Sequence, residues 1–560
     1  LDGAIPLIDV VPAAFQPALE AYNALQNYPA GGPPSTNLTA TESYVAGIPG
    51  SLLQANGNGQ VNIWNQYLGI FAQDSWKVTH NLTMNYGLRF DYDHSANPVP
   101  SSAYVSPRLG FAWDPKGDGK TVVRAGAGLF VAPVIFLVPF YLNELGTNGL
   151  HTSLALQTIT GQPTQLLTAT AIEQSLATLQ NPNPALNAAQ LAAAGISIVP
   201  PGPAQQNGVF YTIAKNFKPQ YSIQTSLSVA REIARDLSIE VGYQYYRNVH
   251  IQQNLEANYV QDPAIPVDPF VGPFYMPKPG STGSQPNTQI LQNNQFASIG
   301  SGTYNGLTAS LTKRFSHGLQ FQANYTFSKA MDNTSDYSSL STPFRPDLLA
   351  ADRSLSDFNI TNNFVANAVY TTPFHTDSGS FLAKAFANVS VSPIVYAHSG
   401  LPFTLLVPGI SSTGIALLTA NGAGDHISEA RPFNEGRNTG IGPGFVSWDM
   451  RISKAFYIKR ESGMRLEVIA QATNLLNHTN FSAVNNIFPN TAVVTGGNGV
   501  TGGVTTSAEV STPEGIVNLL NGPYRFKGFV PTSADQLAGP LAFRSANPPR
   551  QLSLGLQFAF

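Results

Sequence analysis

Leu82-Thr-Met-Asn-Tyr-Gly-Leu-Arg-Phe-Asp-Tyr92 alternates apolar with polar or small side chains without a break. Successive side chains of a β-strand point to opposite faces, so this period of two predicts a strand with one apolar and one polar face. The last residues of the chain, 552–560, alternate in the same way. Four further stretches repeat the pattern, at 221–229, 237–245, 319–328 and 448–456.

Less regular stretches also have strand character, at 67–78, 105–113, 121–130, 307–315, 364–370, 389–397 and 464–472. Together with the regular ones they make thirteen predicted strands, and a weak fourteenth lies near Thr39–Ala46. The connections at 79–81, 115–120, 232–236, 316–318, 375–384 and 459–463 are short, and those between them are long. In an antiparallel sheet every second connection lies at the same rim, so we expect one rim of tight turns and one of long loops.

The solvent on the apolar face is not identified by the alternation alone, because a soluble sandwich alternates too. The unequal rims favour a membrane barrel, since outer-membrane barrels have short turns on one side and long loops on the other. Aromatic residues fall near both ends of the strands, as in the girdles of such barrels. They are Trp76, Trp113, Phe315, Phe456, Phe558 and Phe560 toward the tight turns, and Tyr92, Tyr243, Tyr245, Tyr304, Tyr325 and Phe327 toward the long loops. We predict an all-β fold, a transmembrane antiparallel β-barrel whose apolar side chains face lipid and whose polar side chains face a watery lumen.

The composition excludes several other classes of protein. Only 11% of the 560 residues are charged, compared with roughly a quarter in ordinary soluble domains, which suits a surface that faces lipid. The formal charge of −3 provides no basic field for nucleic acid, so we expect no nucleic-acid partner. Without cysteine the chain can form neither disulfides nor cysteine-based metal or redox sites. No uninterrupted apolar run reaches the ~18 residues of a membrane helix, and no secretion signal is visible at the start.

Catalytic and metal-binding patterns are also missing from the sequence. The nine histidines are never three or four residues apart, and there is no Gly-x-Ser-x-Gly motif of a serine hydrolase. Asp114-Pro-Lys-Gly-Asp-Gly119 has the glycines of a tight turn and lacks the remaining acidic positions of a calcium loop. We therefore expect no enzyme activity, no catalytic residue, no cofactor and no metal, although a hydrolase triad assembled in space stays open as a minor alternative.

The candidate functional residues are charged side chains with luminal parity: Arg89, Asp91, Arg108, Arg124, Glu240, Arg451, Arg465 and Glu467. Two interpretations stay open, cross-strand ion pairs that hold the lumen together and charges that line a solute path. Five glycines share this parity and suit curvature or a close-packed filling: Gly87, Gly126, Gly128, Gly242 and Gly555. Asp74 and Lys313 break the pattern on the apolar face, close to tight turns, where the cost of a charge in lipid fades.

Several motifs resemble TonB-dependent outer-membrane receptors, in particular the subgroup with an N-terminal carboxypeptidase-regulatory-like domain. The matches, in order along about residues 40–560, are Ser43-Tyr-Val-Ala-Gly-Ile-Pro49, Tyr67-Leu-Gly-Ile-Phe-Ala-Gln-Asp-Ser-Trp-Lys-Val78, Asn81-Leu-Thr-Met-Asn-Tyr-Gly-Leu-Arg-Phe90, Ser106-Pro-Arg-Leu-Gly-Phe-Ala-Trp-Asp114, Ser356-Asp-Phe358, Ser399-Gly-Leu-Pro-Phe403, Gly436-Arg-Asn438, Asp449-Met-Arg-Ile-Ser-Lys454, Arg465-Leu-Glu467 and Asn474-Leu-Leu-Asn-His478. The final residues Leu556, Phe558 and Phe560 are similar to the last-strand signal by which the barrel-assembly machinery recognises its clients.

The resemblance implies a 22-stranded barrel in the bacterial outer membrane, an N-terminal plug, and a segment that contacts the TonB complex to energise uptake. About 13–14 strands are too few for that barrel, so we interpret the sequence as its C-terminal part. Residues 1–60 are expected to form an extracellular loop and a possible strand of the upstream barrel, and 61–560 the rest of the barrel, with an Ala-rich helix at 181–195 inside a loop. Contact with TonB would run through the missing N-terminal part.

The implied function is energised uptake of a large nutrient whose identity the sequence does not give. The long loops are rich in Asn, Gln, Ser, Thr and Tyr, which suits a hydrogen-bonding solute such as an oligosaccharide, a peptide or a chelate. Two alternatives stay open: a passive outer-membrane channel, and a surface adhesin or scaffold barrel.

Overall fold

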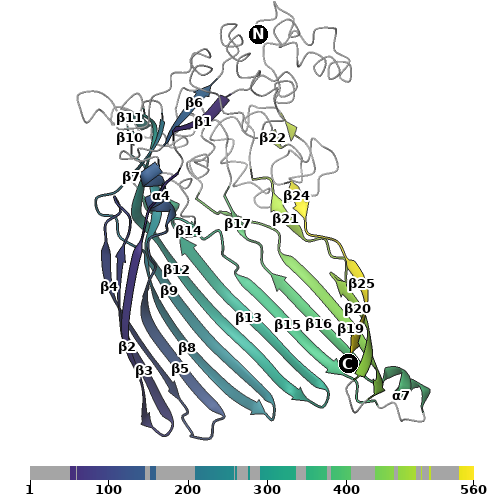
Figure 1. The fold of residues 1–560 in the computed structure, drawn as a ribbon. Coiled ribbons are helices and arrows are strands. Elements are labelled where there is room, and N and C mark those ends of the chain that lie inside the picture. Colours follow the sequence, from purple (N-terminus) through teal and green to yellow (C-terminus); the bar gives the residue numbers. More distant parts are fainter. Residues whose placement is uncertain are drawn as a thin grey trace, which may run out of the picture.

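The computed structural model describes residues 51–57, 60–144, 152–158, 208–257, 259–261, 275–277, 290–335, 349–374, 380–404, 436–459, 464–486, 493–494, 504–505 and 542–560. Fifteen strands of this part form one sheet, and because β7 and β14 lie off the main path, that path has thirteen strands (Figure 1). In spatial order, which is also chain order, they are β2 (Gln66–Thr79), β3 (Leu82–His94), β4 (Ser102–Trp113), β5 (Thr121–Val131), β8 (Tyr221–Ala234), β9 (Leu237–Glu256), β12 (Ile290–Ser316), β13 (Leu319–Asp332), β15 (Asn362–Thr371), β16 (Val389–His398), β19 (Phe445–Lys459), β20 (Met464–Thr473) and β25 (Gln551–Ala559).

The thirteen predicted strands are confirmed one for one, and every neighbouring pair on the path is antiparallel. The weak strand near 39–46 and the helix at 181–195 lie outside the described residues. Within the described part, β2 pairs only with β3 and β25 only with β20 along the path, so these two strands form its ends.

The register keeps the two faces separate across the whole sheet. Met84 of β3 lies opposite Trp76 of β2 and Phe111 of β4, while Arg89 lies opposite Phe71 and Ser106 on the other face. If the register between two strands slipped by one residue, apolar side chains would turn to the polar face. The apolar pattern therefore fixes the register.

Within the part of the chain that the structure describes, no second layer of protein covers the apolar face. Leu88 is 53% exposed, and in the last strand Leu554 is 87% exposed. A soluble sandwich would bury these leucines against a second sheet, away from water. A membrane barrel exposes them to lipid instead. The outward orientation predicted for 82–92 and 552–560 is therefore confirmed.

The tight-turn rim follows from local sequence. Between β12 and β13, His317 and Gly318 have φ of 53° and 76°, which are typical of a two-residue hairpin turn. In the turn from β4 to β5, the Asp114 carboxylate accepts hydrogen bonds from the backbone N–H groups of Lys116, Gly117 and Gly119. The predicted tight turn is thus confirmed there. The connection from β15 to β16 differs from a simple short turn, since it contains a helix, α7 (Phe381–Phe386).

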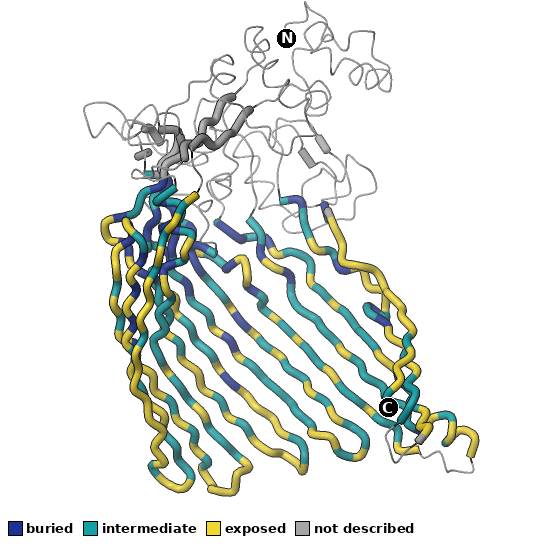
Figure 2. Tube along the Cα trace, in the orientation of Figure 1, coloured by how far each residue is buried: buried dark blue, intermediate teal, exposed yellow. Residues whose placement is uncertain are grey.

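Most of the buried residues of the described part lie toward the long-loop rim (Figure 2). A small hydrophobic core lies here, formed by Val99, Val134, Val138, Leu142, Tyr211, Phe217 and Phe296, around helix α4 (Leu137–Glu144) and strand β7 (Gly208–Ile213), which pairs parallel to β12. The other described elements are η1 (Leu349–Asp352), β14 (Ser354–Leu355) and five two-stranded sheets: β1 (Ser51–Gly57) with β6 (Thr152–Thr158), β10 (Tyr259–Gln261) with β11 (Tyr275–Pro277), β17 (Pro402–Phe403) with β18 (Gly440–Ile441), β21 (Phe481–Val484) with β24 (Phe543–Ala546), and β22 (Val493–Val494) with β23 (Val504–Thr505).

One aromatic residue was placed wrongly by the sequence pattern. Tyr304 was expected in the girdle at the long loops, but it has luminal parity, opposite Tyr246 and Ala330, and its ring stacks on that of Tyr246 with centroids 5.5 Å apart. The prediction considered only how close Tyr304 is to the loop end of its strand. Whether a strand residue faces lipid or lumen depends on its odd or even position along the strand. No helix among the described residues is long and apolar enough to cross a membrane.

Candidate functional site on the luminal face

The polar face of the sheet is hollowed. A groove of about 760 Å³ runs across it and is lined by residues from β2 to β9, including Gln73, Asn85, Arg89, Arg108 and Tyr246. Strands this far apart on the path can line one groove only if the sheet curves around it. The polar face is therefore the inner, luminal face, as the sequence predicts.

Several residues that line the groove are glycines, so no side chain projects into it at their positions. Gly110 of β4 and Gly126 of β5 lie opposite each other on the luminal face, Gly87 of β3 and Gly128 of β5 lie on either side of Arg108, and all four glycines line the groove. A Cβ at Gly128 would lie 3.2 Å from Cγ of Arg108 and 3.1 Å from the Phe130 ring. The predicted luminal parity of Gly87, Gly126, Gly128, Gly242 and Gly555 is confirmed by the register.

Two of the predicted charged residues form an ion pair at the loop end of the groove. Arg89 Nε lies 2.7 Å from Asp91 Oδ1, and the Tyr67 hydroxyl donates to the same oxygen at 2.5 Å. The Arg89 guanidinium passes over Gly69 of β2, where a side chain would collide with it. Arg89 and Asp91 are neighbours along one strand, so this pair holds a side chain in place rather than joining two strands.

Arg108, Arg124 and Glu240 lie on the same face without forming ion pairs among the described residues. The Arg108 guanidinium carbon lies 4.5 Å from the centre of the Phe130 ring, a cation–π contact. Arg124 lies opposite Ala112 and Ser228, and Glu240 lies opposite Ala230 and Ser310. These side chains are exposed to the lumen and present their charges to whatever occupies it.

The remaining predicted charges form a separate group near the other end of the sheet. Arg451 Nη2 lies 3.6 Å from Glu467 Oε1 across β19 and β20. Arg465 lies on the same face, opposite Tyr457 and Ala559. Four strands, β12, β13, β15 and β16, separate this group from Glu240 on β9, so the eight residues share one face but form two groups.

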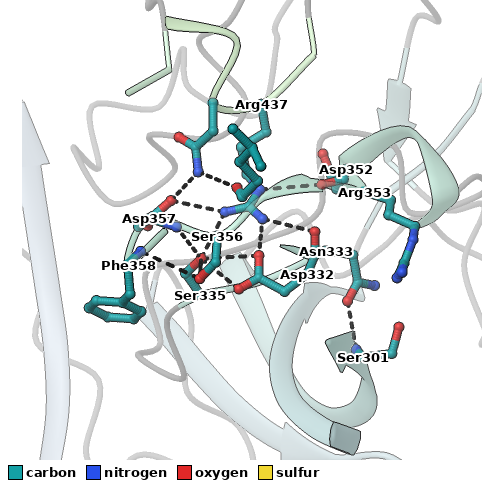
Figure 3. Close-up of polar contacts among 12 residues, drawn as sticks. Ser301, Asp332, Asn333, Ser335, Asp352, Arg353, Ser356, Asp357, Phe358 and Arg437 are labelled. Atoms are coloured by element: carbon teal, nitrogen blue, oxygen red, sulfur yellow. Dashed lines mark hydrogen bonds and ion pairs between the residues drawn. The ribbon is translucent and has the colours of Figure 1, made fainter. Parts of the chain in front are cut away.

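A buried network at the long-loop rim was missed as a site by the sequence reasoning (Figure 3). Arg437 is the centre of the network. The Arg437 guanidinium forms ion pairs with Oδ1 of Asp332, the last residue of β13, and with Oδ1 of Asp357 at 3.0 Å. It also donates to Ser335 Oγ at 3.0 Å and to the backbone oxygens of Asp332 at 3.0 Å and Asp352 at 3.3 Å. We call these residues the Arg437 network.

The network joins two motifs that the sequence showed only as parts of a resemblance. Gly436-Arg-Asn438 supplies Arg437, and Asn438 Nδ2 donates to Asp357 Oδ1 and to Leu355 O. Ser356-Asp-Phe358 supplies the acceptor Asp357, while the backbone N–H of Asp357 donates to Ser335 Oγ. The signal for this site was the presence of complementary Asp and Arg residues in two such motifs, but no spacing rule connects positions about eighty residues apart.

A second hollow of about 360 Å³ lies beside the Arg437 network on the luminal side, and we call it the rim pocket. Its apolar wall is formed by Phe130, Ile135, Tyr221, Ile251 and Phe358. Hydrogen-bonding groups face it as well, from Gln220, Ser222, Asn248, Ser335 and Ser356. The Phe358 ring is 75% exposed although its backbone is held next to the network.

No group of three or more metal-ligating side chains occurs among the described residues. The terminal residues Leu556 and Phe558 lie opposite Val468 and Leu466 on the outer face, and Phe560 follows β25.

The chain matches a known family over most of its length. The family described as outer membrane beta barrel domain matches residues 14–100 and 96–512. No curated protein matches the chain.

Several solved structures are similar to this one. The outer membrane transporter YddB from Escherichia coli is 11% identical, with a TM-score of 0.41, and the match covers 74% of this chain and 42% of that one. The FrpB iron transporter from Neisseria meningitidis is 10% identical, with a TM-score of 0.38 and coverage of 75% and 42%. The siderophore receptor PirA from Pseudomonas aeruginosa is 11% identical, with a TM-score of 0.33 and coverage of 74% and 46%.

This chain therefore spans less than half the length of the structures that it matches. Their names are those of transporters and receptors rather than enzymes. With its outward apolar face, its luminal groove and the match over most of its residues, the chain belongs to the outer membrane beta barrel domain family and its place is the bacterial outer membrane.

Proposed function

We propose that this chain is the C-terminal barrel part of a TonB-dependent receptor that imports a large nutrient across the outer membrane. One observation carries the proposal: thirteen consecutive strands keep an apolar face outward and a polar, grooved face inward. A wall of this kind separates lipid from a water-filled path. The motifs that resemble TonB-dependent receptors support the energised form of transport.

The luminal charges have two tasks in this proposal. Arg89 and Asp91 neutralise each other, as do Arg451 and Glu467, so they stiffen the wall at little electrostatic cost. Arg108, Arg124 and Glu240 keep their charges directed into the lumen, where charged rings set selectivity or hold a filling domain. We assign these three residues to contact with the plug or the solute.

The rim pocket is proposed as the first contact of the solute. Flat aromatic faces beside amide and hydroxyl groups favour a ligand with many hydrogen-bonding groups and apolar patches, such as an oligosaccharide, a peptide or an organic chelate. Phe358 is the most accessible ring in this wall, because the Arg437 network fixes its backbone while its ring stays exposed. The groove below the pocket continues the path toward the tight-turn rim.

The whole receptor is proposed to include the plug, the TonB-contact segment and the carboxypeptidase-regulatory-like domain ahead of this part. Leu556, Phe558 and Phe560 would serve as the assembly signal.

Uptake by cells that make the complete receptor tests the proposal. Cells are given panels of labelled oligosaccharides, peptides and chelates, with the TonB complex intact or deleted. We expect accumulation of one solute class only when the complex is intact. Accumulation that is independent of the complex would instead support a passive channel, and binding of cells to a surface without accumulation would support an adhesin.

The role of the rim pocket is tested with Phe358→Ala in the same assay. Because an aromatic contact is lost, we expect the solute concentration that gives half-maximal uptake to rise about tenfold, while the maximal uptake rate is preserved. Phe381→Ala is the matched control, because Phe381 is 81% exposed on α7 at the opposite rim. Equal effects of the two variants would contradict a role for the pocket.

A further inference from the structure

Charges on the outer face of the sheet are few and nearly all of one sign. In the described strands of the main path, Asp74 is the only carboxylate with outward parity. Five cations share that parity: Arg231, Arg247, Lys313, Lys329 and Lys454. A lipid-facing surface that must avoid charge has no reason to favour cations unless anions lie beside it.

Three cations lie on neighbouring strands near the long-loop rim. Arg247 on β9 lies directly opposite Thr303 on β12, and Arg353 Nη2 donates to Thr303 Oγ1 at 3.3 Å. Lys329 on β13 lies opposite Asn305, two residues further along β12. Arg247 and Lys329 are therefore two strand spacings apart across β12 and two residues apart along it, which places their Cα atoms roughly 12 Å from each other. We call Arg247, Thr303, Asn305, Lys329 and Arg353 the Thr303 patch.

The cations of the patch are free to meet a ligand. All three side chains are exposed, and the ion pairs of the described residues do not include them. Two acidic residues of the same rim, Asp332 and Asp357, bind Arg437 on its inner side. Figure 3 shows the Arg353 side chain pointing away from that network.

The depth of the patch matches a lipid headgroup. One row closer to the middle of the strands, Leu307 and Phe327 lie opposite each other and are about half exposed on the outer face. The neighbouring Tyr243 is also exposed, and its hydroxyl donates to Asn305 Oδ1 at 2.7 Å. Aromatic rings with a polar tip mark the boundary between acyl chains and headgroups. The cations thus begin where the apolar band ends.

We propose that the Thr303 patch binds the phosphate groups of a phosphorylated glycolipid of the outer leaflet. Guanidinium groups form paired hydrogen bonds with phosphate, and an ammonium group adds a point charge. The long-loop rim of an outer-membrane barrel faces the outer leaflet, and the apolar row beneath the patch offers contact to the acyl chains of the same molecule. The proposal rests on membership of the barrel family and does not depend on energised import.

Lipid retention by the complete receptor tests the proposal. The receptor is purified in detergent from outer membranes and incubated with bis-phosphorylated lipid A, its dephosphorylated form, phosphatidylglycerol or inorganic phosphate, and bound lipid is counted by native mass spectrometry. The variant replaces the three cations by glutamine, Arg247→Gln, Arg353→Gln and Lys329→Gln. We expect its retention of bis-phosphorylated lipid A to fall at least about tenfold.

The matched control replaces the outward cations elsewhere on the sheet, Arg231→Gln, Lys313→Gln and Lys454→Gln, and should retain the lipid like the wild type. Each variant is checked by the shift in gel mobility on heating that a closed barrel shows. If the triple variant fails this check, the single variant Arg247→Gln is used and a smaller loss in the same direction is expected. Unchanged retention by the patch variant, an equal loss in the control, or equal binding of the dephosphorylated lipid would overturn the proposal. Displacement by phosphatidylglycerol or by inorganic phosphate as effective as by lipid A would also overturn it.

Discussion

The two rims of the sheet join the same strands by different means. At the tight-turn rim, the turn from β4 to β5 is held by residues a few positions apart, the Asp114 carboxylate and the N–H groups that follow it. At the long-loop rim, Arg437 bonds to Asp332, which is 105 residues away, and to Asp357, which is 80 residues away. Local turns form without the rest of the protein, whereas the Arg437 network needs the sheet to bring its members together. We expect the two rims to respond differently to substitution.

Arg437→Met should have the largest effect. It leaves the Asp332 carboxylate, whose side chain is 10% exposed, in a buried place without its cation. Removing one partner of a buried ion pair costs about 3–5 kcal/mol. We expect rapid proteolysis at the long-loop rim, with the tight-turn rim still protected, and a lower urea midpoint for unfolding of the complete receptor.

The double variant Arg437→Met with Asp332→Asn separates charge from packing. Neutralising the stranded carboxylate should recover part of the lost stability. No recovery in the double variant would mean that the network acts through shape and hydrogen bonds to the backbone rather than through charge.

Gly318→Ala should have an intermediate effect, confined to the tight-turn rim. Gly318 has a φ of 76°, and an added Cβ would collide with the carbonyl oxygen of Thr371. Strain of this kind costs on the order of 1–3 kcal/mol. Gly119→Ala is the control, because Gly119 has a similar φ of 71° but open space around it. Thermal unfolding in detergent compares the two, and equal midpoints would mean that φ alone sets the cost.

Arg451→Gln should have the smallest effect. Its partner Glu467 is 3.6 Å away and the Arg451 side chain is 46% exposed to the lumen, so the pair contributes about 0–1 kcal/mol. The unfolding midpoint should barely change and both rims should stay protected from protease. A loss as large as that of Arg437→Met would show that the luminal pairs, rather than the rim network, hold the loops.

The strands were predictable because each face of the sheet meets a different solvent. Alternation in 82–92 and 552–560 encodes which side chains turn outward, and the observed register follows it strand by strand. The eight charges predicted to face the lumen have the parity of the polar face in the observed register. Which of these charges form ion pairs was not predictable. Arg89 pairs with a residue of its own strand, whereas Arg451 pairs with a residue of the neighbouring strand.

The sites at the loop end were not predictable, for a physical reason that Tyr304 and Arg437 illustrate. The distance of a residue from the end of its strand does not indicate whether its side chain faces lipid or lumen. Tyr304 was therefore assigned to the aromatic girdle, although its ring stacks on that of Tyr246 in the lumen. The Arg437 network and the Thr303 patch combine residues from β9, β12, β13 and the segments beyond them, which no periodic pattern links.

The sequence by itself determined the strands, their two faces and the unequal lengths of the connections, because these depend on side-chain alternation and on local turn chemistry. Only the tertiary structure decided which charged groups meet, where the luminal face is hollow and where cations gather beside the lipid. Those features depend on how strands far apart in the chain align, and alignment is a property of the whole sheet.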